Sequence, residues 1–212
     1  MTDYLEIQTT DAENFKSHES AYLSFLRRMQ QDETKEHVMP NMDNSEPSGL
    51  LYLIKEERNE HRRWTTDTGQ IDLLYDLEKG SIVGVSAVEN SNLHPDYASG
   101  GNRLWMDKQY RANHNITKHL LTANLNWAMT NNKNGMILTF NEYNKILWDV
   151  ISAKGKVASF SNMWSDWWSD CVPIAEPIIV HNTKQWAVIK PCTYFSLDQL
   201  KHDIKRIQHD YS

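Results

Sequence analysis

The stretch that decides the fold covers residues 71–88, IDLLYDLEKGSIVGVSAV. Two runs rich in aliphatic residues, 71–77 and 81–88, are separated by the tripeptide EKG. Runs of this length and composition form strands, and a short break containing glycine between them is typical of a hairpin. The sequence therefore predicts an antiparallel pair of strands near the middle of the chain.

The residues before this hairpin predict a strand and two helices. Residues 4–8 are compatible with a strand and are followed by residue types that begin helices. Apolar residues at three- and four-residue spacing then predict a helix over at least 20–31. Residues 32–48 contain two prolines among many Asp, Asn and Ser residues, which indicates a loop, and a second helix is expected from residue 50 to about 63.

The residues after the hairpin predict a loop, strands and helices. A Gly- and Asn-rich loop over 90–102 leads into a short strand over 103–107, and we consider this loop a candidate frame for a substrate entrance. A continuous apolar stripe predicts a helix over 115–130. The apolar run 136–140 is typical of a buried strand.

Four elements complete the order: a helix over 145–153, strands over 174–180 and 185–190, and an amphipathic helix over 196–210. Gly155 is placed to cap the first of these helices. Ser196 followed by Gln199 is the sequence pattern of a capping box, which predicts the start of the last helix.

Composition restricts the class of protein. Hydrophobic residues make up 40% and charged residues 24% of the 212, which is typical of a folded protein, and we expect one domain over residues 1–212. The formal net charge of −6 argues against nucleic acid and anionic membranes as partners. Residues 1–14 lack the features of a signal peptide, and Cys171 and Cys192 suggest neither a disulfide framework nor a metal site. We therefore expect a cytoplasmic protein without a bound metal.

The order of these elements over residues 3–192 resembles that of the GNAT (N-acetyltransferase) superfamily. Three segments carry the resemblance: residues 71–88, residues 103–121 (RLWMDKQYRANHNITKHLL) and residues 140–156 (FNEYNKILWDVISAKGK). The resemblance implies an α/β (α+β) fold, in which helices flank a mixed, mostly antiparallel central sheet of about six or seven strands. The helix over 196–210 is then an addition at the C-terminal end.

The resemblance also implies a function, an acyl-CoA-dependent N-acyltransferase that moves an acetyl or other acyl group from acetyl-CoA to the amine of a small molecule or protein. Family members hold pantetheine between the fourth and fifth strands and bind the diphosphate at the start of the third helix, where free N–H groups and the helix dipole attract anions. By position, cofactor binding falls to Leu104, Trp105, Met106, Arg111, Asn113, His114, Asn115, Ile116, Thr117, Lys118 and Asn144.

Three residues are candidates for catalysis by position in this fold. Glu142 and His114 are candidates to deprotonate the amine, and Tyr143 is a candidate to protonate the departing thiolate. Each also has an ordinary structural explanation. A carboxylate and a polar residue are common at helix starts, and a tyrosine beside a strand end is often a packed aromatic.

Two departures from the family pattern keep other functions open. Residues 112–117 read ANHNIT, without the two small residues, Gly and then Gly or Ala, that let the family backbone approach phosphate, and Ile151 stands where a catalytic tyrosine is common. One alternative is a catalytically degenerate GNAT-like binding protein, such as a virus-encoded accessory or virion component. Another is a nucleobase-modifying enzyme of this fold, which the acidic charge disfavours. A homodimer is compatible with such a fold.

A cluster of tryptophans also has two interpretations. Residues 163–168, MWSDWW, contain three of the eight tryptophans of the chain. Such a cluster can stack a base or cage a substrate, or it can pack an irregular segment onto the sheet.

Overall fold

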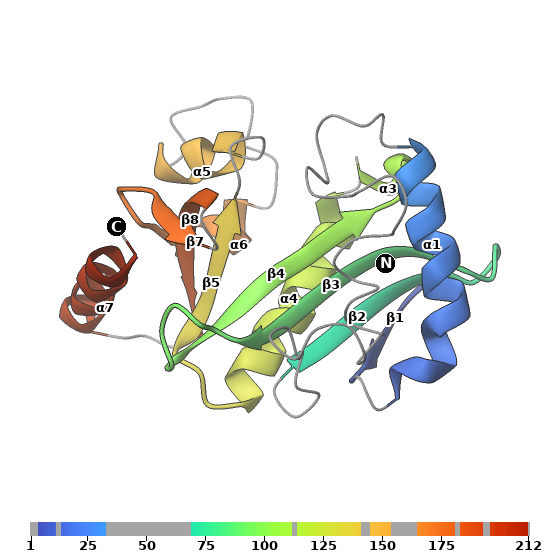
Figure 1. Ribbon diagram of the computed structural model, residues 1–212, viewed down its shortest axis with the longest axis horizontal. Coiled ribbons are helices and arrows are strands. Elements are labelled where there is room, and N and C mark those ends of the chain that lie inside the picture. Colours follow the sequence, from blue (N-terminus) through green and yellow to red (C-terminus); the bar gives the residue numbers. More distant parts are fainter. Residues whose placement is uncertain are drawn as a thin grey trace. The chain divides into compact units, whose positions relative to one another are not determined.

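The computed structural model describes residues 4–11, 14–32, 69–111, 114–140, 145–153, 165–180, 183–192 and 196–211. Figure 1 shows the helices and strands coloured along the sequence. The chain divides into two compact units, the first made of Met1–Glu89 and Asn102–Asn124 and the second of Asn90–Gly101 and Leu125–Ser212. The single domain expected over residues 1–212 stays a prediction, because the placement of one unit on the other is not determined.

The sheet is mixed and mostly antiparallel. Its strands are β1 (Leu5–Thr10), β2 (Gly69–Asp76), β3 (Ser81–Asn90), β4 (Tyr97–Met106), β5 (Gly135–Phe140), β6 (Val172–Pro173), β7 (Ile178–Val180) and β8 (Thr183–Pro191). Hydrogen bonds give the order β1-β2-β3-β4-β5-β8-β6, with β7 paired to β8. β4 and β5 are parallel, whereas β1–β2, β2–β3 and the pairs made by β8 are antiparallel. The predicted fold class is confirmed, and the described residues contain eight strands where about six or seven were expected.

The helices agree with the expected order. They are a 3-10 helix η1 (Phe15–His18) and the α-helices α1 (Glu19–Asp32), α3 (Lys108–Arg111), α4 (His114–Thr130), α5 (Lys145–Ser152), α6 (Ser165–Trp168) and α7 (Leu197–Asp210). The helices predicted over 20–31, 115–130, 145–153 and 196–210 are confirmed. The helix expected from residue 50, and the loop before it from residue 33 onward, lie outside the described residues. None of the described helices is both long and apolar enough to cross a membrane.

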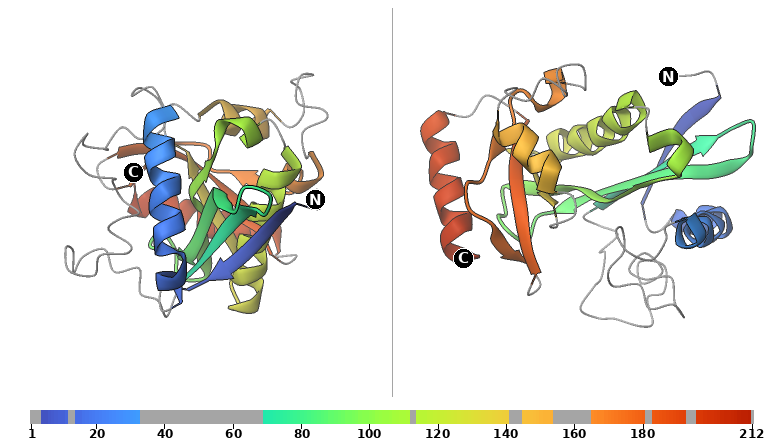
Figure 2. Two further views of the ribbon diagram at one scale, coloured as in Figure 1. Left: turned by 90° about the vertical axis from the view of Figure 1, so that its right-hand side faces the viewer. Right: turned by 90° about the horizontal axis from the view of Figure 1, so that it is seen from above.

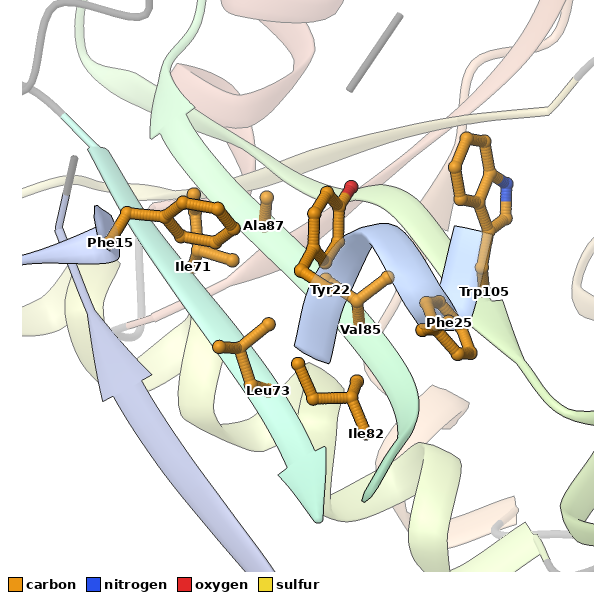
Figure 3. Close-up of a cluster of buried hydrophobic side chains, with 9 residues drawn as sticks. All are labelled: Phe15, Tyr22, Phe25, Ile71, Leu73, Ile82, Val85, Ala87 and Trp105. Atoms are coloured by element: carbon orange, nitrogen blue, oxygen red, sulfur yellow. The ribbon is translucent and has the colours of Figure 1, made fainter. Parts of the chain in front are cut away.

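In the first unit, helices cover both faces of the β1–β2–β3 hairpin sheet (Figure 2). Because side chains alternate along a strand, Ile71 and Leu73 of β2 face α1 while Leu74 faces α4. The cluster on the α1 side is drawn in Figure 3 and consists of Phe15, Tyr22, Phe25, Ile71, Leu73, Ile82, Val85, Ala87 and Trp105. The cluster on the α4 side consists of Leu5, Leu74, Val83, Met106, Tyr110, Ile116 and Leu120.

In the second unit, α7 forms part of the core. Leu200 and Ile207 of α7 are buried together with residues of β4, β5, β7 and β8. On α5, Trp148 donates a hydrogen bond from Nε1 to the carbonyl of Ala187 in β8 at 3.1 Å. The helix expected as an addition beyond residue 192 therefore closes an apolar face of this unit.

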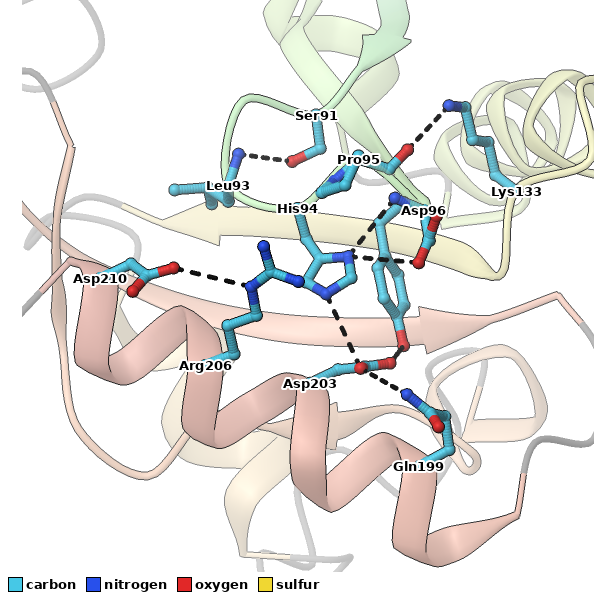
Figure 4. Close-up of polar contacts among 11 residues, drawn as sticks. Ser91, Leu93, His94, Pro95, Asp96, Lys133, Gln199, Asp203, Arg206 and Asp210 are labelled. Atoms are coloured by element: carbon cyan, nitrogen blue, oxygen red, sulfur yellow. Dashed lines mark hydrogen bonds and ion pairs between the residues drawn. The ribbon is translucent and has the colours of Figure 1, made fainter.

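A buried carboxylate lies in the contact between α7 and the rest of the second unit (Figure 4). Asp203 is 2% exposed and accepts hydrogen bonds from the Tyr97 hydroxyl and from Gln199 Nε2, each at 2.8 Å. Burial, with Asp203 beside it, raises the pKa of Tyr97, so the hydroxyl remains a donor. His94 Nε2 lies 3.7 Å from Asp203 Oδ1.

The capping box expected at Ser196 is half formed. Ser196 Oγ accepts the Gln199 N–H at 3.1 Å, as predicted. The side chain of Gln199 donates to Asp203 and does not bond to the backbone N–H of Ser196. A buried carboxylate without donors is costly, whereas water can satisfy the exposed helix end.

Two strand predictions were wrong in extent. The loop expected over 90–102 ends early, because β4 begins at Tyr97 and pairs in parallel with β5, so that a candidate entrance loop is confined to residues 91–96. The strand expected over 174–180 is replaced by β6 and β7, and Pro177, directly before β7, has no N–H that could join a ladder.

Two glycines of the β4–β5 region carry different packing constraints. A Cβ at Gly135 would collide with the backbone of Lys190 and Pro191, whereas a Cβ at Gly100 would collide with the flexible side chain of Met136. We predict that Gly135→Ala lowers the free energy of unfolding by about 2 to 3 kcal/mol, because backbone must shift, and that Gly100→Ala lowers it by about 1 kcal/mol. Urea denaturation of both variants tests this order, and equal losses would contradict it.

Candidate functional site

The chain leaves β4 through a short turn that directs it toward α4. The N–H of Asp107, the residue after β4, donates to the carbonyl of Val83 at 2.8 Å, and its own carbonyl accepts the N–H of Tyr110 at 2.9 Å. The second bond begins α3, the four-residue helix that precedes α4. Residues 112 and 113 lie outside the described residues, and α4 begins at His114.

The side chains at the end of β4 belong mostly to the core. Trp105 is 8% exposed and packs in the cluster on the α1 side, while Met106 is 5% exposed and packs in the cluster on the α4 side. Leu104 is partly buried against the same α4-side cluster. Trp105 and Met106 can therefore offer a ligand little more than their backbone atoms.

The first turn of α4 has the properties of an anion-binding helix start. The first four N–H groups of an α-helix have no acceptor within the helix, and the helix dipole places partial positive charge there. This turn has no acidic residue. Ile116 is buried, Asn115 is exposed, and Thr117 and Lys118 are partly exposed, so polar side chains border the exposed side of the turn.

Two arginine side chains make contacts at the end of β4. Arg111 is exposed and donates from Nε to the carbonyl of Met106 at 2.8 Å, which fixes its guanidinium group to this strand end. Arg28 of α1 contacts the carbonyl of Ile82 and lies 3.4 Å from Asp107 Oδ2. Arg28 thereby places a positive charge beside the Asp107 carboxylate.

The helix that carries this turn is held to the sheet by a buried polar network. Asp72 of β2 accepts hydrogen bonds from Asn124 of α4 at 2.7 Å and from Thr9 of β1 at 2.8 Å, and Asn124 also accepts from the Ser86 hydroxyl at 2.8 Å. Burial raises the pKa of Asp72, although the hydrogen bonds from Thr9, Asn124 and Gln70 act in the opposite direction.

The structure tests only part of the predicted site. Asn113, Glu142, Tyr143 and Asn144 lie outside the described residues, as does the side chain of His114, and their roles stay predictions. Ile151, at the position of the family's usual tyrosine, is 8% exposed. In the part of the chain that the structure describes, no group of His, Cys, Asp or Glu residues is arranged to hold a metal ion.

The described part of the tryptophan cluster supports the packing interpretation. Trp167 is 6% exposed, and its ring meets that of Trp168 edge to face with centroids 4.5 Å apart. Trp168 in turn lies 6.5 Å from the ring of Phe140 in β5. Residues 163 and 164 lie outside the described residues.

The pattern of the sequence located the turn but not the contacts that shape it. Arg28 and Asp107 are 79 residues apart, and neither belongs to a local motif. An aspartate directly after a strand is a weak signal that does not identify its partner.

No protein-family model and no curated protein sequence matches the chain. Solved structures with the GNAT fold do match it. A ribosomal-protein alanine acetyltransferase from Vibrio fischeri is 12% identical, with 92% of this chain and 97% of that chain covered and a TM-score of 0.58. A GNAT-family acetyltransferase from Staphylococcus aureus is 16% identical, with 89% and 100% covered and a TM-score of 0.53.

A third match is an acetyltransferase from Streptococcus agalactiae, which is 15% identical, with 89% of this chain and 99% of that chain covered and a TM-score of 0.52. At these identities the likeness establishes the fold. The expectation of a divergent chain with the GNAT fold is confirmed.

The buried Asp72 predicts a pH dependence of stability. Its pKa in the folded protein lies above the ordinary value of 3.8, so the folded state binds this proton more tightly than the unfolded chain does. The associated stability is present below pH 3.8 and is lost as the pH rises through the folded pKa. Asp72→Asn has no such proton. We therefore expect the free energy of unfolding of the wild type, minus that of Asp72→Asn, to fall in denaturant titrations as the pH rises above 3.8. Parallel pH profiles would contradict this.

Proposed function

We propose that the chain is an acyl-CoA-dependent N-acyltransferase that transfers an acetyl or related acyl group to an amine. The observation that carries the proposal is the start of α4 in a chain with the GNAT fold, where the first turn of a helix has no acidic residue and Arg111 is fixed at the end of β4. The name of the Vibrio fischeri protein describes an acetyltransferase for an alanine of a ribosomal protein. For this chain we propose the amine of a small molecule or protein as the acceptor.

The residues at this turn suit the charge of CoA. A diphosphate accepts hydrogen bonds from backbone N–H groups at a helix start, and a guanidinium group adds charge-assisted bonds. Asn115 and Thr117 stand where the family has small residues. The Asn115 side chain is exposed, and its amide group can itself donate to a phosphate oxygen. When bound, acyl-CoA supplies the activated thioester carbonyl.

The remaining chemistry is assigned to residues of this chain. Glu142, with His114 as the second candidate, accepts a proton from the acceptor amine. Backbone N–H groups of residues 104–106 stabilise the negative charge that develops on the carbonyl oxygen, since the N–H of Asp107 already donates to Val83. Tyr143 donates a proton to the departing sulfur, a role that Ile151 cannot fill because its side chain has no ionisable proton.

Calorimetric titration with acetyl-CoA tests the proposal directly. We expect saturable binding with a dissociation constant between about 1 μM and about 1 mM, the usual range for enzyme substrates. Incubation with a panel of amines and amino-terminal peptides should then give acetylated products detectable by mass spectrometry. If millimolar acetyl-CoA produces neither heat nor a thermal shift, the proposal is wrong.

A matched pair of substitutions at Asn115 tests where the diphosphate binds. Asn115→Gly removes a side chain from the helix start, lets phosphate approach the backbone and should tighten acetyl-CoA binding several-fold. Asn115→Asp has nearly the same size and adds a negative charge, so it should weaken binding by about tenfold. The loss in Asn115→Asp should shrink at high salt. If both variants bind as the wild type does, the diphosphate is held elsewhere.

A second candidate is a GNAT-like binding protein without transferase activity. The buried apolar Ile151 at the position of the usual tyrosine favours it. Such a protein would acetylate none of the amines, and a stoichiometric partner would co-purify with it in the absence of CoA binding.

A further inference from the structure

The hydroxyl of Tyr110 joins α3 to the turn between β2 and β3. It donates a hydrogen bond to Asp76 Oδ2 and accepts one from Lys79 Nζ at 2.7 Å. Lys79 also lies 3.5 Å from Asp76 Oδ2 through Nζ, and its backbone N–H donates to Asp76 Oδ1 at 2.9 Å. The three side chains therefore form a closed set of contacts between two separate segments of the first unit.

The charges in this set are consistent with its geometry. The hydrogen bond from Tyr110 lowers the pKa of Asp76, and the hydrogen bond to Tyr110 raises the pKa of Lys79. Burial raises the pKa of Tyr110 itself. At neutral pH Asp76 is thus a carboxylate, Lys79 an ammonium and Tyr110 a neutral phenol. Hydrogen bonds to ionised groups are about twice as strong as those between neutral groups.

The ring of Tyr110 makes a second connection. Tyr110 is 8% exposed and packs in the α4-side cluster with Met106 of β4 and with Ile116 in the first turn of α4. Tyr110 thus shares one buried cluster with the strand end and the helix start, and its hydroxyl contacts the β2–β3 turn. It lies in α3, the segment that joins β4 to α4.

We infer that Tyr110 is a positioning residue that orients the start of α4 toward the diphosphate of the acyl donor. The inference rests on the proposed function. Without the usual small residues at 115 and 117, the helix start is less free to adapt to phosphate, so its orientation has to be set by contacts made before the ligand binds. The bonds of Tyr110 to Asp76 and Lys79 supply such a contact from the β2–β3 turn, a separate segment of the first unit.

The test is Tyr110→Phe, which keeps the ring and removes the hydroxyl. The variant should bind CoA about tenfold more weakly, as expected for the loss of a hydrogen bond to a charged group. Its affinity for pantetheine, which lacks the diphosphate, should stay within about twofold of the wild type. CoA is titrated by calorimetry, and pantetheine is followed by ligand-detected NMR.

The matched control is Tyr97→Phe. Tyr97 also donates its hydroxyl to a buried aspartate, Asp203, but in the contact with α7 in the second unit. This variant should lose stability without a change in the CoA-to-pantetheine affinity ratio. If Tyr110→Phe fails to fold, Lys79→Met is the second test variant. The side chain of Lys79 is 48% exposed, and its replacement keeps the hydrogen bond from Tyr110 to Asp76. It should show a smaller loss of CoA affinity in the same direction.

The outcomes separate this inference from the proposed function. If the wild type does not bind CoA, both are wrong. If the wild type binds CoA and Tyr110→Phe binds it within about twofold, only the role of Tyr110 is wrong. Equal losses for CoA and pantetheine would indicate general damage and also overturn it. Independently of any ligand, amide hydrogen exchange over residues 114–120 should be faster in Tyr110→Phe than in Tyr97→Phe, and equal exchange would overturn the inference.

Discussion

The burial of both faces of the β2–β3 pair is the constraint on which the first unit depends. Ile71 and Leu73 pack beneath α1, and Leu74 packs beneath α4, so neither helix can be removed without exposing apolar surface. The same alternation sends Asp72 toward α4, where its hydrogen bond to Asn124 fixes the helix along the sheet. The start of α4, and therefore the candidate anion site, is positioned by this packing.

Local periodicity explains why most of the fold could be predicted from the sequence. The hairpin and α4 have long, regular apolar patterns, and Gly80, with a φ of +60°, lies in the turn where the sequence placed a glycine break. The first half of β4 was missed because Ala98, Ser99 and Gly100 have no strand pattern of their own. The pairing of Ala98 and Ser99 with β5 is a tertiary effect, and Gly100 lies directly against the side chain of Met136.

The candidate site was predictable where it follows a local motif and not where it depends on distant residues. The helix start at 114–118 could be placed from its position after a strand. The bond between Tyr110 and Asp76 joins residues 34 positions apart, and the contact of Arg28 with Asp107 joins residues 79 positions apart. Charged and hydroxyl side chains of this kind look like ordinary surface residues in a sequence, since nothing local shows that they will lie in contact.

The closure of the second unit by α7 bears on how the protein can be handled. Leu200 and Ile207 fill its interior, and the carbonyl of Tyr211, directly after the helix, accepts the N–H of Ile179 in β7 at 2.7 Å. An affinity tag or surface linkage placed directly after residue 211 would lie beside the core of the second unit. It therefore needs a flexible spacer so that α7 can pack against that core. Proteolytic cleavage within α7 would remove these buried side chains and expose an apolar surface of the second unit. The remaining fragment should therefore aggregate.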